Sequence, residues 1–185
     1  MPAPYPRALR SQIAALNRLA QHDPHASLVR DVVRLRAADA CEYCLMPTTG
    51  KFEIEHIIPK QRWPDFLSGH YPGLRRAERL ALATPDHIAN FARSCFFCNN
   101  AKGGRPQTRT LRRFFDPRFD LWPDHFAYSP TKGYGVILGL TTIGAETVRV
   151  LQFHAGGAEG AFAERYTAIL GGSYPPPWLR AAYNL

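Results

Sequence analysis

The chain has 185 residues, and 45% of them are hydrophobic, which is enough to build a core. No stretch approaches the roughly 18 to 20 consecutive apolar residues of a membrane span, and the N-terminus has no secretory signal pattern. We therefore expect a cytoplasmic protein with no membrane partner. A formal net charge of +8 at pH 7 and a pI near 9.6 favour a polyanionic partner such as nucleic acid.

Helical periodicity predicts two helices near the start of the chain, over residues 7–21 and 25–38. A turn at Asp23-Pro24 separates them. We expect their buried apolar stripes to be Leu9, Ile13, Leu16 and Leu19 in the first helix and Leu28, Val32 and Leu35 in the second.

An alternating pattern predicts a strand over residues 51–57. A long connection follows over residues 60–90, with several Pro and Gly turn signals. We expect a second strand over 88–93 and then a helix from Cys95, for which Ser94 can act as the N-cap.

The C-terminal third predicts a β-hairpin and two helices. The strands are expected over residues 126–129 and 136–140, and the helices over 142–153 and 158–170. We see no internal repeat.

All four cysteines lie in two CxxC pairs, Cys41 with Cys44 and Cys95 with Cys98. Two such pairs fill a closed tetrahedral zinc site, with Zn–S distances of about 2.3 Å. Two disulfides would need an oxidising compartment. An iron–sulfur cluster or a redox pair is a further alternative. The paired spacing favours structural zinc.

Four residues beside the cysteines suit phosphodiester hydrolysis, which needs a base to activate water and a cation to stabilise charge. A neutral imidazole takes a proton near pH 7, so we predict His56 as the general base. Carboxylate and amide oxygens suit Mg²⁺, so Glu55 and Asn99 are predicted as ligands of a catalytic divalent cation. Asn90 is predicted to orient the His56 ring. Taken singly, these residues also fit a core histidine, a solvated carboxylate and turn or cap asparagines.

The alternation within the first predicted strand raises a difficulty. In a flat strand the side chains of Glu55 and His56 point to opposite faces. For both to serve one site, the strand must end, twist or bulge there, and Pro59 makes such a break plausible.

A basic stretch follows the proposed site. Six basic residues and no acidic residue lie between Arg93 and Phe115. A solvated surface is one explanation, but the position beside the site favours contacts with nucleic-acid phosphates. The predicted phosphate-binding residues are Lys102, Arg105, Arg109, Arg112 and Arg113.

These motifs together resemble the HNH endonucleases of the ββα-metal superfamily. The resemblance rests on the first CxxC, on EHIIP at 55–59, on Asn90 five residues before the second CxxC, and on CNNAK at 98–102. The last letter of the motif is Asn, which makes this an HNN variant. Downstream segments look like those of a bacterial branch of the family, so the resemblance covers roughly residues 28–153.

The resemblance implies an α+β protein with a ββα-metal nuclease core over residues 41–115, stapled by the four-cysteine zinc site. Residues 1–40 would form a helical extension, and residues 116–185 a hairpin with further helices. The implied activity is metal-dependent hydrolysis of double-stranded DNA, with structural Zn²⁺ and catalytic Mg²⁺ or Mn²⁺. The alternatives are a zinc-stabilised nucleic-acid-binding module without catalysis and a scaffold in a larger complex. The intact Glu55–His56 pair favours the nuclease.

Overall fold

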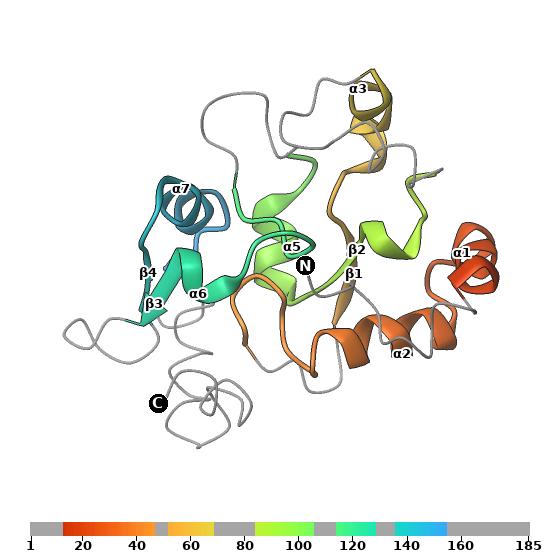
Figure 1. Ribbon diagram of the computed structural model, residues 1–185, viewed down its shortest axis with the longest axis horizontal. Helices are drawn as coiled ribbons and strands as arrows, with labels where there is room; N and C mark the ends of the chain where they lie inside the picture. Colours follow the sequence, from red (N-terminus) through yellow and green to blue (C-terminus); the bar gives the residue numbers. More distant parts are fainter. Residues whose placement is uncertain (1–12, 47–51, 69–83, 106–113, 129–135, 155–185) are drawn as a thin grey trace.

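The computed structural model describes residues 13–46, 52–68, 84–105, 114–128 and 136–154. Within these ranges the fold is mixed α+β, with two small antiparallel sheets of two strands each and helices around them (Figure 1). The helix expected over 158–170 lies outside the described residues.

Within the described residues the N-terminal helices are α1 (Ile13–His22) and α2 (Ser27–Arg36), close to the expected bounds. Residues 7–12 of the first expected helix lie outside the described residues. Between them, the Asp23 carboxylate accepts a hydrogen bond from the backbone N–H of His25 at 2.9 Å.

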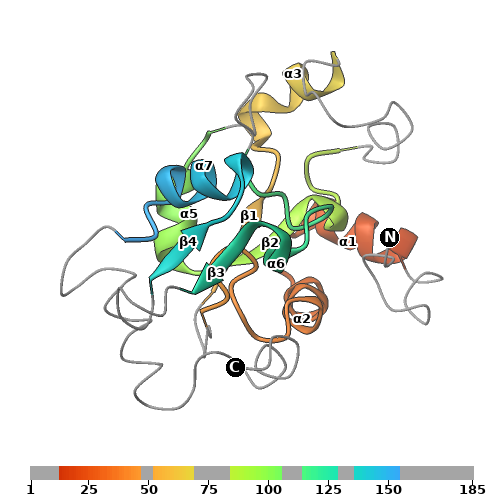
Figure 2. The ribbon, with the colours of Figure 1, turned by 60° about the vertical axis from the view of Figure 1, so that its left-hand side comes forward.

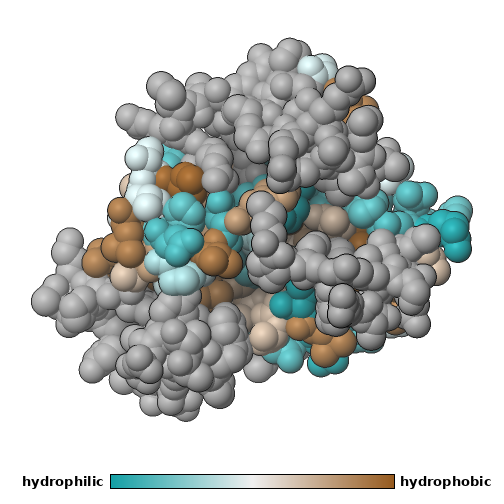
Figure 3. All heavy atoms as spheres, viewed as in Figure 1, coloured by the Kyte–Doolittle hydropathy of each residue, from teal (hydrophilic) through white to brown (hydrophobic). Residues whose placement is uncertain are grey.

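The predicted buried face of α2 is partly wrong. The structure buries Val29, Val32 and Val33 and leaves Leu28 and Leu35 exposed. Apolar residues occupy much of the circumference of this helix, so periodicity alone does not choose a face. Packing against α1 and the first sheet determines which face of α2 is buried. Hydrophobic residues therefore remain at the surface over α2 (Figure 3).

The first sheet pairs β1 (Glu53–His56) with β2 (Phe91–Ser94) in antiparallel register. Glu55 lies opposite Ala92, and His56 lies opposite Phe91. The described parts of the long connection between the strands contain three short helical segments. They are η2 (Lys60–Arg62), α3 (Trp63–Leu67) and η3 (Ile88–Asn90).

The two faces of this sheet pack against different layers. Phe52, Ile54 and Phe91 join the apolar cluster beneath α1 and α2. On the other face, Ala92 and Ile57 belong to the cluster that contains the four cysteines and the C-terminal hairpin. The helix α5 (Phe96–Lys102) follows β2 directly and lies against this second face (Figure 1).

The C-terminal unit matches the expected hairpin and helix, with a short helix before them. Its elements are α6 (Trp122–His125), β3 (Phe126–Tyr128), β4 (Ile137–Gly139) and α7 (Thr142–Val150). Figures 1 and 2 show α7 beside β4, on the opposite side of the molecule from α1.

Backbone contacts hold α7 close to the hairpin. A Cβ atom built on Gly144 would lie 2.1 Å from the backbone oxygen of His125, and one on Gly139 would lie 2.3 Å from the backbone nitrogen of Ala145. Only glycine allows this approach, because real Cβ contacts are longer. The indole N–H of Trp122 donates to the backbone oxygen of Tyr43 at 3.1 Å, which joins the hairpin unit to the first CxxC loop.

In the part of the chain that the structure describes, every helix is too short or too polar to span a bilayer.

Candidate functional site

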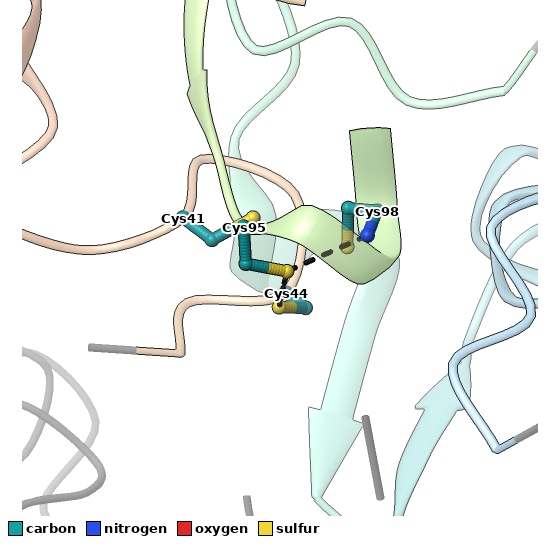
Figure 4. Close-up of side chains that lie close together, drawn as sticks. All are labelled: Cys41, Cys44, Cys95 and Cys98. Atoms are coloured by element: carbon teal, nitrogen blue, oxygen red, sulfur yellow. Dashed lines mark hydrogen bonds between the residues drawn. The ribbon is translucent and has the colours of Figure 1, made fainter. Parts of the chain in front are cut away.

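The four cysteines converge as the spacing predicted (Figure 4). Their sulfur atoms lie within 4.8 Å of one another, all four side chains are buried, and Sγ of Cys44 lies 3.9 Å from Sγ of Cys95. Four sulfurs at about 2.3 Å from a tetrahedral zinc ion would be about 3.8 Å apart. The donor set and its size therefore fit structural zinc.

Local backbone geometry prepares each CxxC pair for a metal. In the first pair, the backbone oxygen of Cys41 accepts from the N–H of Leu45 at 2.8 Å, and Leu45 adopts a positive φ of 60° to close the turn. In the second pair, Cys95 is the N-cap of α5, and its sulfur accepts from the N–H of Cys98 at 3.5 Å. The expected cap, Ser94, instead ends β2.

Crowding of the thiols makes a cation necessary for ionisation. Hydrogen bonds with Cys41, and then with Cys44, raise the pKa of Cys95 and of Cys98 well above the ordinary thiol value. Four thiolates so close together would repel one another strongly in a buried site. A divalent metal offsets this repulsion when it displaces the protons.

The first CxxC loop is also docked onto the first sheet. The backbone N–H of Glu42 donates to the oxygen of Arg93 at 2.9 Å, and the N–H of Arg93 donates to the Glu42 carboxylate at 2.7 Å. The guanidinium of Arg36 holds both oxygens of that carboxylate. The cysteine cluster thus fixes β2 relative to α2 and α5.

Glu55 projects from β1 toward α5 and is only 4% exposed. Its Oε2 accepts from the hydroxyl of Tyr43 at 2.7 Å, and its Oε1 pairs with the ammonium group of Lys102. Burial, and then the charge of Glu55, raise the pKa of Tyr43 well above its ordinary value, so the hydroxyl keeps its proton and donates. Lys102 is fully buried and also donates to the backbone oxygen of His56 at 2.9 Å.

This arrangement bears on the expected catalytic metal. Both oxygens of Glu55 already have partners, and the cation beside the carboxylate is Lys102. Asn99 is half-buried on α5, and its side chain makes no hydrogen bond within the described residues. A divalent ion bound by Glu55 would therefore have to take the place of Lys102 beside this carboxylate. Lys102, expected to contact phosphate, lies in the interior.

His56 lies on the other side of the strand. Its ring packs edge-on against Phe91, with centroids 5.0 Å apart, and its Nε2 lies 2.8 Å from Oδ1 of Asp86. The regular register through His56 and Phe91 contains no bulge, so Glu55 and His56 are separated as in a flat strand. Burial lowers the pKa of His56 from its ordinary value, against the raising effect of Asp86, and the imidazole is neutral at pH 7.

Asn90 is fully buried and joins two backbone segments. Its Oδ1 accepts from the N–H of Ile58 at 2.9 Å, and its Nδ2 donates to the backbone oxygens of Ile58 at 3.0 Å and Pro85 at 2.9 Å. These bonds hold the turn before η3 beside the chain that leaves β1. The residue hydrogen-bonded to the His56 ring is Asp86, which the sequence analysis did not predict. An acidic residue in a turn 30 positions from His56 gives no local signal of this contact.

The exposed basic residues near this end of β1 lie mainly on η2. Lys60 has a side chain 53% exposed, and its Nζ lies 2.8 Å from Oδ1 of Asp86. Gln61 lies against Gly104, which places η2 beside the end of α5. Arg105 is exposed just after α5, and one of its nitrogens donates to the backbone oxygen of Val150 at 3.4 Å. The remaining predicted phosphate contacts, Arg109, Arg112 and Arg113, lie outside the described residues.

The described residues thus place four predicted site residues, together with Asp86, in two groups around β1. Glu55, Lys102 and Asn99 lie on the side of α5, and His56 and Asp86 lie on the side of Phe91. No family model, no curated protein and no solved structure matches this chain. The molecule is a mixed α+β protein with a buried four-cysteine cluster suited to zinc.

Proposed function

We propose that the protein is a DNA endonuclease of the HNH type, in which His56 is the general base. The observation that carries this proposal is the state of His56, at the end of β1 with a side chain that is 20% exposed. Burial lowers the pKa of this imidazole, so at pH 7 it can accept a proton from water. In chain order, the first cysteine pair precedes β1, and the second pair lies where β2 passes into α5. This order of two strands and a helix with flanking cysteine pairs supports the nuclease interpretation.

The proposed reaction is attack of water on a phosphodiester. His56 takes a proton from the water, the new P–O bond forms, and the bond to the leaving oxygen breaks as that oxygen gains a proton from solvent. Lys60 and Arg62 on η2 are exposed and close to His56 in the chain, so they can supply positive charge to the phosphate backbone. The formal net charge of +8 supports a nucleic-acid substrate.

A divalent cation, Mg²⁺ or Mn²⁺, would supply charge stabilisation at the phosphate and at the leaving oxygen. Glu55 and Asn99 are its proposed ligands, on the condition that Lys102 first leaves Glu55. The metal requirement is therefore tested separately from the role of His56.

The buried pair of Glu55 with Lys102 favours a second candidate function. A carboxylate already neutralised in the interior suits a zinc-stabilised module that binds nucleic acid without cleaving it. In that case the pair is a structural element of the fold, and the basic surface alone carries the function.

One assay separates the two candidates. Supercoiled plasmid is incubated with wild type, His56→Ala and the matched control His22→Ala, an exposed histidine at the end of α1, with Mg²⁺ or Mn²⁺ and with EDTA. The endonuclease proposal expects nicking that EDTA abolishes, a rate lower by roughly 10² to 10⁴ for His56→Ala, and no change for His22→Ala. Full cleavage by His56→Ala would refute the mechanism. DNA binding without cleavage by wild type would favour the second candidate.

A further inference from the structure

We infer that Asp86 is the positioning residue for His56, and that it leaves Nδ1 as the nitrogen that accepts the proton from water. This inference rests on the proposed function, because it assigns a role within the same reaction. It concerns a residue that the sequence motifs do not include.

The chemistry of the contact decides the tautomer. Oδ1 of Asp86 lies 2.8 Å from Nε2 of His56. An ionised carboxylate only accepts hydrogen bonds, so Nε2 must carry the ring proton. A neutral imidazole has a single N–H, and Nδ1 is therefore left with a free lone pair. Within the described residues Nδ1 has no hydrogen-bond partner, so it is available to water or substrate.

Asp86 is itself held in place and kept ionised. Burial raises the pKa of Asp86, but hydrogen bonds from Lys60 and from His56 outweigh burial and hold that pKa below its ordinary value. Nζ of Lys60 lies 2.8 Å from the same Oδ1. The turn that carries Asp86 is pinned by Asn90, whose Nδ2 donates to the backbone oxygen of Pro85 and whose N–H donates to that of His87 at 2.7 Å.

The ring is thus fixed in two directions. Phe91 forms a T-shaped pair with the imidazole at an interplanar angle of 86°, which restricts the plane of the imidazole. Asp86 sets the rotation within that plane and the identity of the protonated nitrogen. Asn90, predicted to orient His56, acts one step further away, through the backbone that carries Asp86. In enzymes where a carboxylate holds an imidazole in one tautomer, replacing that carboxylate lowers the catalytic rate by up to about 10⁴-fold.

Two variants remove the contact in different ways. Asp86→Ala deletes the carboxylate, and Asp86→Asn keeps the shape of the turn but no longer obliges Nε2 to carry the proton. Asp65→Asn is the matched control, because Asp65 is a half-exposed acid on α3 that pairs with Arg62. Each protein is compared with wild type in the plasmid assay, with titration of Mg²⁺.

The second readout is the tautomer itself, measured in the resting protein without DNA. Long-range ¹H–¹⁵N spectra at pH 8, well above the ordinary histidine pKa of about 6.5, report which ring nitrogen is protonated. The signals of His56 are those missing in His56→Ala. We expect a protonated Nε2 and a bare Nδ1 in wild type and Asp65→Asn, and a mixture of tautomers in Asp86→Ala.

Cleavage by Asp86→Ala should fall by at least about tenfold, within the range for such carboxylates, while the Mg²⁺ concentration for half-maximal rate stays unchanged. Asp86→Asn should also be slower than wild type. A proton on Nδ1 of His56 in wild type, or wild-type cleavage by both Asp86 variants, overturns the inference and leaves the endonuclease standing. A protonated Nε2 in a protein that binds DNA without cutting it overturns the endonuclease and the role of Asp86 together.

Discussion

Replacing Lys102 with methionine should destabilise the protein strongly. Lys102 is fully buried and Glu55 is 4% exposed, and the ammonium pairs with the carboxylate and with the backbone oxygen of His56. Methionine keeps the length of the aliphatic stem but removes the charge, so Glu55 is left as a buried anion without a cationic partner. Breaking a buried pair in this way costs about 3–5 kcal/mol.

The expected loss can be measured by chemical or thermal unfolding at a fixed zinc concentration. For a chain of this size, 1 kcal/mol corresponds to about 2–4 °C in Tm, so Lys102→Met should melt about 6–20 °C below wild type. Lys60→Met is the matched control. Its ammonium pairs with Asp86 at the surface, where ion pairs are worth about 0–1 kcal/mol.

A double-mutant cycle tests whether the pair itself is the cause. Glu55→Gln removes the anion while its amide oxygen can still accept from the hydroxyl of Tyr43. The double variant Glu55→Gln with Lys102→Met should be more stable than the sum of the single losses predicts, by about 1–3 kcal/mol. Strictly additive losses, or a loss below about 1 kcal/mol for Lys102→Met, would show that the buried pair has been misjudged.

The same variant reports on the proposed metal ligand. Without Lys102, Glu55 is free to bind a divalent cation, and a ligand that binds only the folded state raises Tm. Mg²⁺ or Mn²⁺ should therefore raise the Tm of Lys102→Met more than that of wild type. An equal response of the two proteins would argue against Glu55 as a ligand.

Four further outcomes are expected. Cys95→Ser should lose bound zinc by elemental analysis and several kcal/mol of stability, because zinc binding to a small site is largely folding free energy. Gly144→Ala should cost about 1–3 kcal/mol or more by denaturant unfolding, because its Cβ would lie 2.1 Å from a backbone oxygen. Burial lowers the pKa of His87, so the folded state favours the neutral ring. The contribution of His87 to stability should be full above about pH 6.5 and should fall as the pH drops below that value. His87→Gln should therefore reduce the difference in Tm between pH 7.5 and pH 5.5. Neutralising Arg105 and Arg109 should weaken DNA binding on all sequences and reduce the slope of log affinity against log salt by about one unit for each lost phosphate contact.

Local patterns in the sequence predicted much of the fold. The CxxC spacing predicted the cysteine cluster, because two thiolates three residues apart already lie on one turn. The strand expected over 51–57 contains β1, and the hairpin expected after residue 126 contains β3 and β4. These features depend on neighbours in the chain, which periodicity and turn residues report directly.

Contacts between distant segments could not be predicted in the same way. Lys102 and Glu55 are 47 residues apart, and each has an ordinary solvent-exposed explanation when it is considered alone. Only the docking of α5 on β1 turns them into a buried pair. Asp86 and His56 meet because Asn90 ties the turn that carries Asp86 to the chain that leaves β1, and nothing in the spacing of those three residues encodes this. The HNH core, the activity and the catalytic cation remain predictions.

Polar side chains cover part of the edges of the first sheet. The backbone oxygen of His56, at the end of β1, accepts from Lys102, and the oxygen of Phe52, just before β1, accepts from Arg30. On β2, Arg36 binds the oxygen of Phe91, and Glu42 binds both the N–H and the oxygen of Arg93. These contacts occupy the polar groups of Phe91 and Arg93 along the outer edge of β2, which hinders edge-to-edge association through that strand. Because Glu42 sits inside the first CxxC loop, release of zinc would also uncover the edge of β2, and aggregation through that strand should accompany metal loss.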